Sequence, residues 1–353
     1  MRRLRSKRFT TAGLALGAAV LVAACGSSGG GSGSSSGSSG TLNGSGSTLQ
    51  LVYQQAAIQA FKSIQPSITV NYGGGGSGKG RTDLASNVVQ FAGSDSPIPS
   101  TDLHLFNGKT VLYFPILISP ITVSYNLSGV SNLKLDAPVI ADIFQAKITK
   151  WNDPKIAALN PGVKLPSTAI TIAHRSDSSG TTQNFSEFLV EGAPGVWKLG
   201  SDSTINWPAN SQGGSGNSGV AQIIKQTAGA VGYVDFADAK ASQLTYASVK
   251  NKDGSYVAPS VTAASEAASN AQLKPDLTFS AIWAPGATSY PITAQSWVLL
   301  YQKQSSSNTT KMLKAYVGYL VGDGQKLLAP LGYATLPSNI DQQAKAQVSK
   351  IGT

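Results

Sequence analysis

Residues 170–190 read ITIAHRSDSSGTTQNFSEFLV. The first four residues are apolar or β-branched, which predicts a strand over 170–173. Residues 182–190 place apolar side chains near helical spacing, which predicts a helix. Between them, residues 175–182 are an arginine, an aspartate, a glycine and small hydroxyl residues. A strand, a polar loop and a helix form the repeating unit of α/β folds, and ligands bind beyond the strand and beside the helix N-terminus.

The same unit recurs along the chain. Apolar spacing predicts helices over residues 49–64, 80–89, 139–144, 220–227 and 310–321, and strands over residues 68–72, 111–125, 231–236 and 292–301. Alternating strands and helices over about 300 residues favour an α/β architecture with mostly parallel sheets.

Three further segments also place Gly, Ser and Thr at the start of a helix or the end of a strand. They are GSTL at 46–49, GGSGKG at 75–80 and AGSDSP at 92–97. Helix N-termini carry unpaired N–H donors and partial positive charge, so several of them at one point could bind an anion without a cluster of lysines. For any single segment, an ordinary cap or turn is the alternative.

The first 24 residues predict an export signal. Residues 2–8 carry five basic residues and no acid, and residues 9–24 are apolar or small. The latter stretch is short for a membrane-spanning helix. The sequence VAAC at 22–25 resembles the bacterial lipobox, which implies cleavage before Cys25 and lipidation of its side chain. The alternative is an ordinary secretion signal followed by an unrelated cysteine.

Composition excludes several classes of protein. One cysteine and two histidines rule out a disulfide framework and a zinc cage. The net charge of +10 first suggests nucleic acid or an anionic membrane as a partner, but five of the 27 basic residues lie in residues 1–24 and none of the 17 acidic ones does. The remaining +5 is scattered, so we expect no nucleic-acid binding. Residues 26–40 are all Gly or Ser, which predicts a flexible tether, assigned here to residues 25–45.

Six more motifs are spread along the chain between residues 70 and 337. They are VNY at 70–72, ITKWNDP at 148–154, GNSGV at 216–220, GAVGY at 229–233, YPI at 290–292 and LGYATLP at 331–337. Together with the four segments above they resemble the phosphate-binding protein of the high-affinity phosphate ABC importer, and RSDSSGT at 175–181 is the most specific of them. The resemblance covers nearly the whole chain after the signal.

That resemblance implies an α/β, two-lobed periplasmic-binding-protein fold of type II, with the ligand in the interlobe cleft. Lobe 1 would comprise residues 46–119 and 292–353, and lobe 2 residues 120–291. Carried over residue by residue, the implied anion contacts are Thr48, Leu49, Ser77, Asp95, Arg175, Ser179, Gly180 and Thr181. Leu49 stands where the family usually has Phe, so the N–H donor is kept while ring packing over the anion is lost.

Arg175 and Asp95 have distinct expected roles. Arg175 offers a planar fork of donors to two oxygens, and Asp177 is placed to orient that fork. Asp95 would repel an anion unless the ligand carries a proton, as phosphate does and sulfate at neutral pH does not. A buried acceptor without a donor costs on the order of several kcal/mol, so Asp95 is predicted to reject sulfate. The alternative is a cap or turn residue before Pro97.

Other functions fit less well. The segment at 73–80 nearly matches a P-loop, but Gly80 replaces the Ser or Thr that would hold magnesium. No Gly-x-Ser-x-Gly motif of a serine hydrolase lies outside the Gly/Ser tether. A binding protein for sulfate or molybdate is the nearest alternative, and a secreted phosphatase is a more distant one.

We therefore expect a non-enzymatic receptor without cofactor or metal, exported and lipid-anchored at the outer face of the cytoplasmic membrane. Its expected partners are inorganic phosphate, the permease and ATPase subunits of the phosphate ABC importer, and the membrane through the lipid anchor. We expect the receptor itself to be a monomer.

Overall fold

The structure is a computed structural model that describes residues 38–352. The predicted export signal, Cys25 and the tether as far as residue 37 lie outside the described residues, and their assignments stay predictions.

A nine-stranded sheet runs through the described body. Its order is β2-β1-β3-β12-β4-β8-β6-β7, and β9 also pairs with β4. The strands are β1 (Gly40–Gly46), β2 (Ile68–Gly73), β3 (Phe91–Ser94), β4 (Val111–Tyr125), β6 (Thr171–Arg175), β7 (Gln212–Gly214), β8 (Ala230–Asp235), β9 (Thr245–Tyr246) and β12 (Thr293–Tyr301). A second, three-stranded sheet contains β5 (Lys134–Leu135), β10 (Ser248–Lys250) and β11 (Tyr256–Val257).

The main sheet is parallel at both ends and antiparallel in the centre. Strand β1 is parallel to β2 and β3, and β6 is parallel to β7 and β8. Strand β12 is antiparallel to β3 and β4, and β4 is antiparallel to β8. The expectation of mostly parallel sheets is therefore wrong for the centre, because β4 leaves one half of the body and β12 returns to it in the opposite direction.

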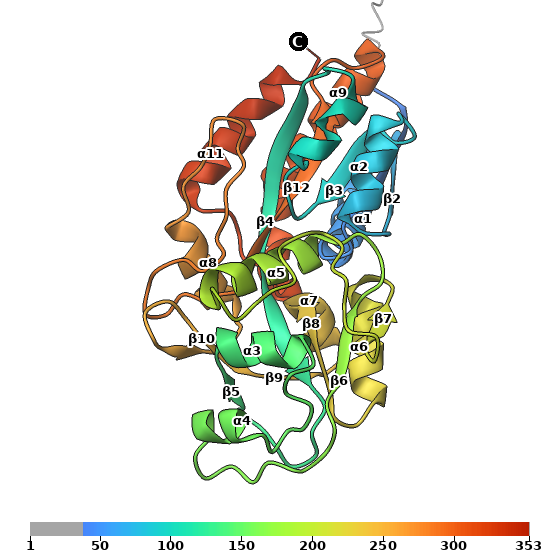
Figure 1. Cartoon of the computed structure of the whole chain (residues 1–353). Coiled ribbons are helices and arrows are strands. Elements are labelled where there is room, and N and C mark those ends of the chain that lie inside the picture. Colours follow the sequence, from blue (N-terminus) through green and yellow to red (C-terminus); the bar gives the residue numbers. More distant parts are fainter. Residues whose placement is uncertain (1–37, 353) are drawn as a thin grey trace, which may run out of the picture. The chain divides into compact units, whose positions relative to one another are not determined.

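Strand β4 joins the two halves (Figure 1). Residues 111–120 pair with β12, whereas residues 121–125 pair with β8. All of β4 beyond its first residue is buried, as expected for an apolar strand covered on both faces. We call the strands β1, β2, β3 and β12, with the helices packed on them, the first half, and β6, β7 and β8 with their helices the second half.

Helices cover both halves of the sheet. In the first half they are α1 (Leu51–Ile64), α2 (Ser77–Ala85), α9 (Ser307–Val321), α10 (Leu328–Leu331) and α11 (Ser338–Gln347), with the 3₁₀ turns η1 (Ser100–Phe106), η2 (Asp323–Leu327) and η3 (Val348–Lys350). In the second half they are α3 (Ala137–Phe144), α4 (Pro154–Leu159), α5 (Gly180–Gly192), α6 (Gly216–Gln226) and α7 (Phe236–Ala241). Helix α8 (Val261–Ser269) packs on β4 and β12.

Cap residues separate two classes of helix. Six helices begin after a side chain that accepts a backbone N–H of the first turn: α3, α4, α5, α7, α8 and α9. By contrast, α1, α2 and α6 begin after Gln50, Gly76 and Ser215 without such a bond. No cap side chain occupies the first N–H groups of these three helices.

Most predicted elements are confirmed with shifted ends, and one boundary is wrong. The strand predicted over 111–125 is β4, and the helix predicted over 80–89 is α2, which ends earlier because Asn87 takes a left-handed backbone conformation. Strand β1 begins at Gly40, inside the segment assigned to the tether. Its glycine-rich sequence predicts flexibility, but pairing with β2 along its length satisfies its backbone hydrogen bonds.

Candidate functional site

Loops that precede helices meet between the two halves of the body. The N–H of Gly180, at the start of α5, donates to Ser77 Oγ at the start of α2 over 3.1 Å. The N–H of Asp95 donates to the same oxygen at 3.1 Å. The N–H of Asn217, in the first turn of α6, donates to Thr48 Oγ1 at 3.3 Å, just before α1. The fold thus brings together the four segments that the sequence analysis singled out.

Asp95 lies at the centre of this meeting point and is 1% exposed. Ser47 Oγ lies 2.6 and 2.7 Å from its two carboxylate oxygens, Ser296 Oγ donates at 2.5 Å, and Ser77 Oγ lies at 3.4 Å. Burial raises the pKa of Asp95, while the hydroxyls of Ser296 and Ser47 and the charge of Arg175 oppose that rise. Asp95 is therefore a buried carboxyl surrounded by neutral donors.

Arg175 ends β6 with its side chain only 1% exposed. Its Nε donates to Asp177 Oδ1 at 2.7 Å, its Nη2 donates to Asp177 Oδ2, and its Nη1 donates to Thr181 Oγ1 at 3.3 Å. Asp177 also accepts the N–H of Gly216 at 3.1 Å. Although burial alone would raise it, the bonds from Arg175 lower the pKa of Asp177. The Asp177 carboxylate therefore contacts the guanidinium group of Arg175 through two hydrogen bonds.

Two other predicted anion contacts, Ser179 and Leu49, form hydrogen bonds with residues close to them in the sequence. Ser179 is fully buried and caps α5, because its Oγ accepts the N–H of Thr182 at 3.2 Å. The N–H of Leu49 donates to Ser47 Oγ at 3.1 Å. The side chain of Leu49 is fully buried in the hydrophobic core, so it adds to the packing of the first half rather than replacing the family's aromatic ring over an anion.

Gly180 marks one of the closest approaches of the two halves. A Cβ at this position would lie 2.5 Å from Ser77 Oγ and 2.7 Å from Asp95 Cβ. Only glycine lets the first turn of α5 come this near to Asp95, and its N–H is thereby directed at the other half. This explains why a glycine stands inside the most specific sequence motif.

Sequence analysis missed three side chains of the site. Ser47 lies in a quoted motif but was not assigned a role. Ser296 is one of three polar residues in β12, with Thr293 and Gln295, and no sequence signal distinguished it from them. Asn217 is fully buried, and its Nδ2 lies 3.3 Å from both Thr48 Oγ1 and Thr181 Oγ1. Asn217 therefore links a hydroxyl of the first half to one of the second.

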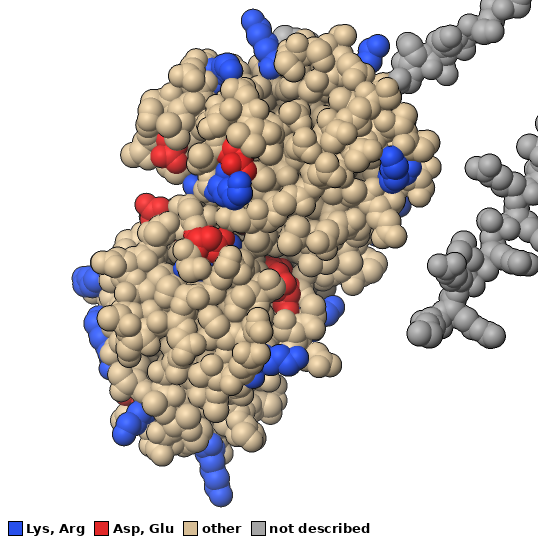
Figure 2. Space-filling view, turned by 90° about the vertical axis from the view of Figure 1, so that its right-hand side faces the viewer, with Lys and Arg blue, Asp and Glu red and all other residues tan. Residues whose placement is uncertain are grey.

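Positive charge at the site comes from arginine rather than from lysine. The two arginines beyond residue 24 are Arg81 and Arg175, and both lie near Asp95. Arg81 is 4% exposed, and its Nη1 contacts Ser94 Oγ at 3.3 Å and Ser96 Oγ at 3.1 Å. On the face drawn in Figure 2 the Lys and Arg side chains stand apart from one another, without a continuous basic patch.

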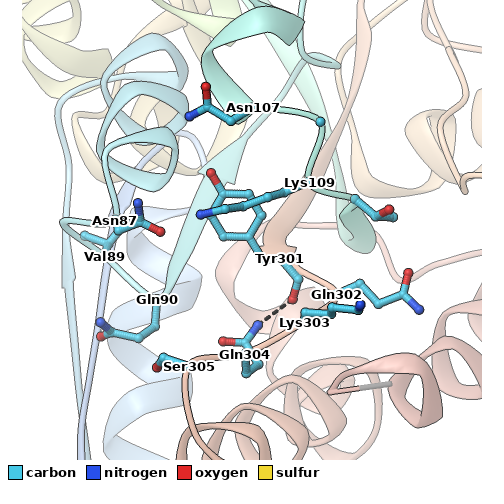
Figure 3. A pocket seen from close by; sticks show the side chains of 12 residues that line it. Asn87, Val89, Gln90, Asn107, Lys109, Tyr301, Gln302, Lys303, Gln304 and Ser305 are labelled. Atoms are coloured by element: carbon cyan, nitrogen blue, oxygen red, sulfur yellow. Dashed lines mark hydrogen bonds between the residues drawn. The ribbon is translucent and has the colours of Figure 1, made fainter.

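Of two cavities in the described body, one borders the site and the other does not. One of about 470 Å³ borders Asp95 and includes Asn184 and Glu187 of α5. The other, of about 720 Å³, lies beyond the end of β12 and is lined by Lys109, Tyr301 and Lys303 among others (Figure 3). None of the predicted anion contacts lines this second cavity.

Residues 38–352 contain neither a candidate metal site nor a candidate membrane-spanning helix. No group of three or more His, Cys, Asp or Glu residues there could hold a metal ion. No helix of this part of the chain is long and apolar enough to cross a membrane.

Comparison with known proteins gives consistent matches. Residues 31–324 match the family model described as the PBP superfamily domain. The phosphate-binding protein PstS of Pasteurella multocida is 37% identical over 284 residues, which is 79% of this chain and 81% of the relative. Phosphate-binding protein PstS 2 of Mycobacterium tuberculosis is 34% identical over 319 residues, covering 87% of this chain and 86% of the relative.

Solved structures agree on the fold. A high-affinity periplasmic phosphate-binding protein, solved with phosphate bound, has a TM-score of 0.73 and 19% identity, covering 87% of this chain and 94% of its own. The phosphate-binding protein of Stenotrophomonas maltophilia has a TM-score of 0.68 and 21% identity, with coverages of 87% and 93%. The predicted α/β periplasmic-binding-protein fold is thus confirmed, and the chain belongs to the PBP superfamily and, within it, to the PstS family of phosphate-binding proteins.

Proposed function

We propose that this protein binds inorganic phosphate outside the cytoplasm and delivers it to the permease of a phosphate ABC importer. The observation that carries the proposal is that a buried carboxyl, Asp95, and a buried guanidinium, Arg175, lie near each other where uncapped helix N-termini meet. Such a site attracts an anion and also offers it an acceptor. Only an oxyanion that carries a proton satisfies both groups.

The proposed phosphate contacts are those carried over from the family. Arg175, oriented by Asp177, supplies charged donors, and Asp95 accepts the proton of the ligand. Neutral donors come from the remaining contacts, which are Thr48, Leu49, Ser77, Ser179, Gly180 and Thr181. Hydrogen bonds within each half, from Ser77 Oγ to Asp95 Oδ2 at 3.4 Å and from Arg175 Nη1 to Thr181 Oγ1 at 3.3 Å, support the proposal that each face of the site is arranged before the anion enters.

We further propose that the halves are the two lobes of a binding protein that closes on its ligand. Lobe 1 would comprise residues 46–119 and 292–353, and lobe 2 residues 120–291. The change of pairing along β4, from β12 to β8 at Pro120–Ile121, supports this division. A hinge at that point would let the starts of α2 and α5 separate and meet again.

The cellular setting is part of the proposal. The protein would be exported, anchored by a lipid on Cys25 and held by its Gly/Ser tether at the outer face of the cytoplasmic membrane. There it would act as a monomer that passes phosphate to the permease and ATPase subunits of the importer. The names of its relatives, which are binding proteins rather than enzymes, support a role without catalysis.

Titration calorimetry tests the proposal directly. Protein stripped of ligand should release or absorb heat with phosphate and bind sulfate far more weakly. Absence of binding to phosphate, or equal affinity for sulfate, would refute it, and molybdate belongs in the same series. Asp95→Asn should narrow the gap in affinity between phosphate and sulfate, because the amide carries no negative charge to repel sulfate and its NH₂ group can donate a hydrogen bond to it. Steady release of phosphate from a model ester would favour a phosphatase instead.

A further inference from the structure

A line of buried polar side chains leads from helix α9 to Asp95. Tyr316 OH donates to Gln54 Oε1 at 2.6 Å, and Gln54 Nε2 donates to Gln50 Oε1 at 2.8 Å. Gln50 Nε2 donates to Ser296 Oγ at 2.9 Å, and Ser296 Oγ donates to Asp95 Oδ1 at 2.5 Å. The four side chains that precede Asp95 are all 0% exposed. None of them belongs to the contacts carried over from the family.

The direction of this line is set by a backbone carbonyl. Gln50 Nε2 also lies 3.2 Å from the carbonyl oxygen of Trp297, which can only accept a hydrogen bond. The amide nitrogen must therefore face Trp297 and Ser296, and Oε1 must face Gln54. Gln54 then donates from its own nitrogen, and its oxygen accepts from Tyr316. Every donor along the line consequently points toward Asp95.

The hydroxyl of Ser296 is thereby given one orientation. Its oxygen accepts the amide hydrogen of Gln50, and its own hydrogen points at Asp95 Oδ1 rather than at the carbonyl of Ser94, which is 3.4 Å away. A carboxylate can only accept hydrogen bonds, whereas a protonated carboxyl must also donate one. A donor locked in this orientation stabilises the charged form of Asp95.

We propose that Ser296, oriented by Gln50, Gln54 and Tyr316, is a specificity-determining positioning residue that holds Asp95 as an acceptor and so favours protonated over fully ionised oxyanions. The inference rests on the proposed function, since it concerns the discrimination exercised by the same site. It adds residues from α1, α9 and β12 that do not touch the ligand.

The charged and titratable groups around Asp95 do not replace the hydrogen bond from Ser296. Arg175 on β6 and Arg81 on α2 face it with positive charge. Burial, followed by the charge of Asp95, raises the pKa of Tyr72 on β2. Burial, followed by the charges of Asp235 and Asp238 and then that of Asp95, raises the pKa of Tyr333 after α10, so both phenols stay neutral. Burial raises the pKa of Asp95 itself, and the hydrogen bond from Ser296 is the foremost of the effects that oppose this rise.

The pH dependence of sulfate binding reports the protonation state of Asp95. Sulfate is fully ionised from about pH 5 to about pH 8, so it brings no proton, and Asp95 must itself be protonated to meet it. Any pH dependence of sulfate binding therefore belongs to the protein and not to the ligand. Losing one hydrogen bond to the charged form should raise the pH midpoint of sulfate binding by about one unit.

The experiment compares sulfate binding by the unaltered protein and by Ser296→Ala, using calorimetry at several pH values in that range. We expect sulfate to bind about tenfold more tightly to the variant near neutral pH, with the midpoint moved upward by about one pH unit. Tyr316→Phe, which removes one oxygen at the far end of the line, should move the midpoint in the same direction by less. The control is Ser119→Ala, which removes a fully buried hydroxyl on the neighbouring strand β4 that makes no contact with Asp95.

The outcomes separate this inference from the proposed function. If the unaltered protein does not bind phosphate, the proposed function fails and this inference fails with it. If it binds phosphate but Ser296→Ala leaves the sulfate profile unchanged, the inference alone is overturned. An equal shift in Ser119→Ala would also overturn it, because any buried hydroxyl would then have the same effect. If Ser296→Ala does not fold, an unshifted pH midpoint of sulfate binding in Tyr316→Phe would overturn the inference, because the hydrogen bonds from Tyr316 to Ser296 would then have no effect on Asp95.

Discussion

Replacing Gly78 by alanine should weaken phosphate binding without destabilising the ligand-free protein. Gly78 lies in the first turn of α2, and its N–H donates to the carbonyl of Ser178 at 3.0 Å across the two halves. A Cβ at Gly78 would lie 2.0 Å from Ser178 Oγ and 2.4 Å from Ser178 Cβ. Rotation of the serine can move its oxygen but not its Cβ. The two halves must therefore separate at this point.

The expected loss of phosphate affinity follows from the overlap between the added Cβ at residue 78 and the Ser178 side chain. Both distances fall well short of the separation that real Cβ contacts keep, and forcing an extra methyl group into a packed interface costs about 1–3 kcal/mol. If the halves part when phosphate leaves, the cost applies only to the closed, ligand-bound state. Phosphate affinity should then fall about 5- to 150-fold. In the open state the same change places alanine in a helix, where it is favoured over glycine by up to about 1 kcal/mol.

Calorimetry with phosphate and thermal unfolding without it are the two assays. Ser178→Gly in the Gly78→Ala background removes both overlapping atoms and leaves the Ser178 carbonyl oxygen at an ordinary 3.4 Å, so affinity should return. Gly318→Ala in α9 is the matched control, because the nearest atom to its Cβ would be 3.9 Å away. Unchanged affinity in Gly78→Ala, or no recovery in the double variant, would refute the argument.

Three further changes test other parts of the site. Arg175→Lys keeps the charge but cannot make two parallel bonds to Asp177, so phosphate affinity measured by calorimetry should fall about 10- to 100-fold; a change of less than twofold would contradict the role of the fork. Asn217→Ala removes the amide donor to Thr48 and should weaken binding severalfold, and an unaltered dissociation constant would count against that contact. Asp235 is fully buried, and within residues 38–352 its Oδ2 has no hydrogen-bond partner. Burial raises the pKa of Asp235, so its favourable contribution is present at low pH and is lost as pH rises through the folded-state pKa. Asp235→Asn should therefore raise the melting temperature more at about pH 8 than at about pH 5, and an equal rise at both pH values would disprove this.

The sequence was sufficient to predict structural features that depend on residues close together in the chain. Arg175 and Asp177 are two residues apart, and their fork contact was expected from that spacing. Strand β4 was predicted in full because most of its residues are apolar and many are β-branched or aromatic, which favours a strand. Strand β1 was not, because its glycine-rich sequence has little preference of its own and is ordered by pairing with β2 and β3.

The α/β alternation and the four polar segments could be predicted from the sequence, because each depends on residues close together in the chain. The anion contacts were carried over from the family resemblance and stay a prediction. Only the tertiary structure decided what surrounds Asp95. Ser296 is 201 positions away from it and reaches it because β12 returns beside β3. Asn217 meets Thr48 across 169 positions for a similar reason. Contacts of this length depend on strand order and register, which arise from the packing of the whole sheet and leave no periodic pattern in the sequence.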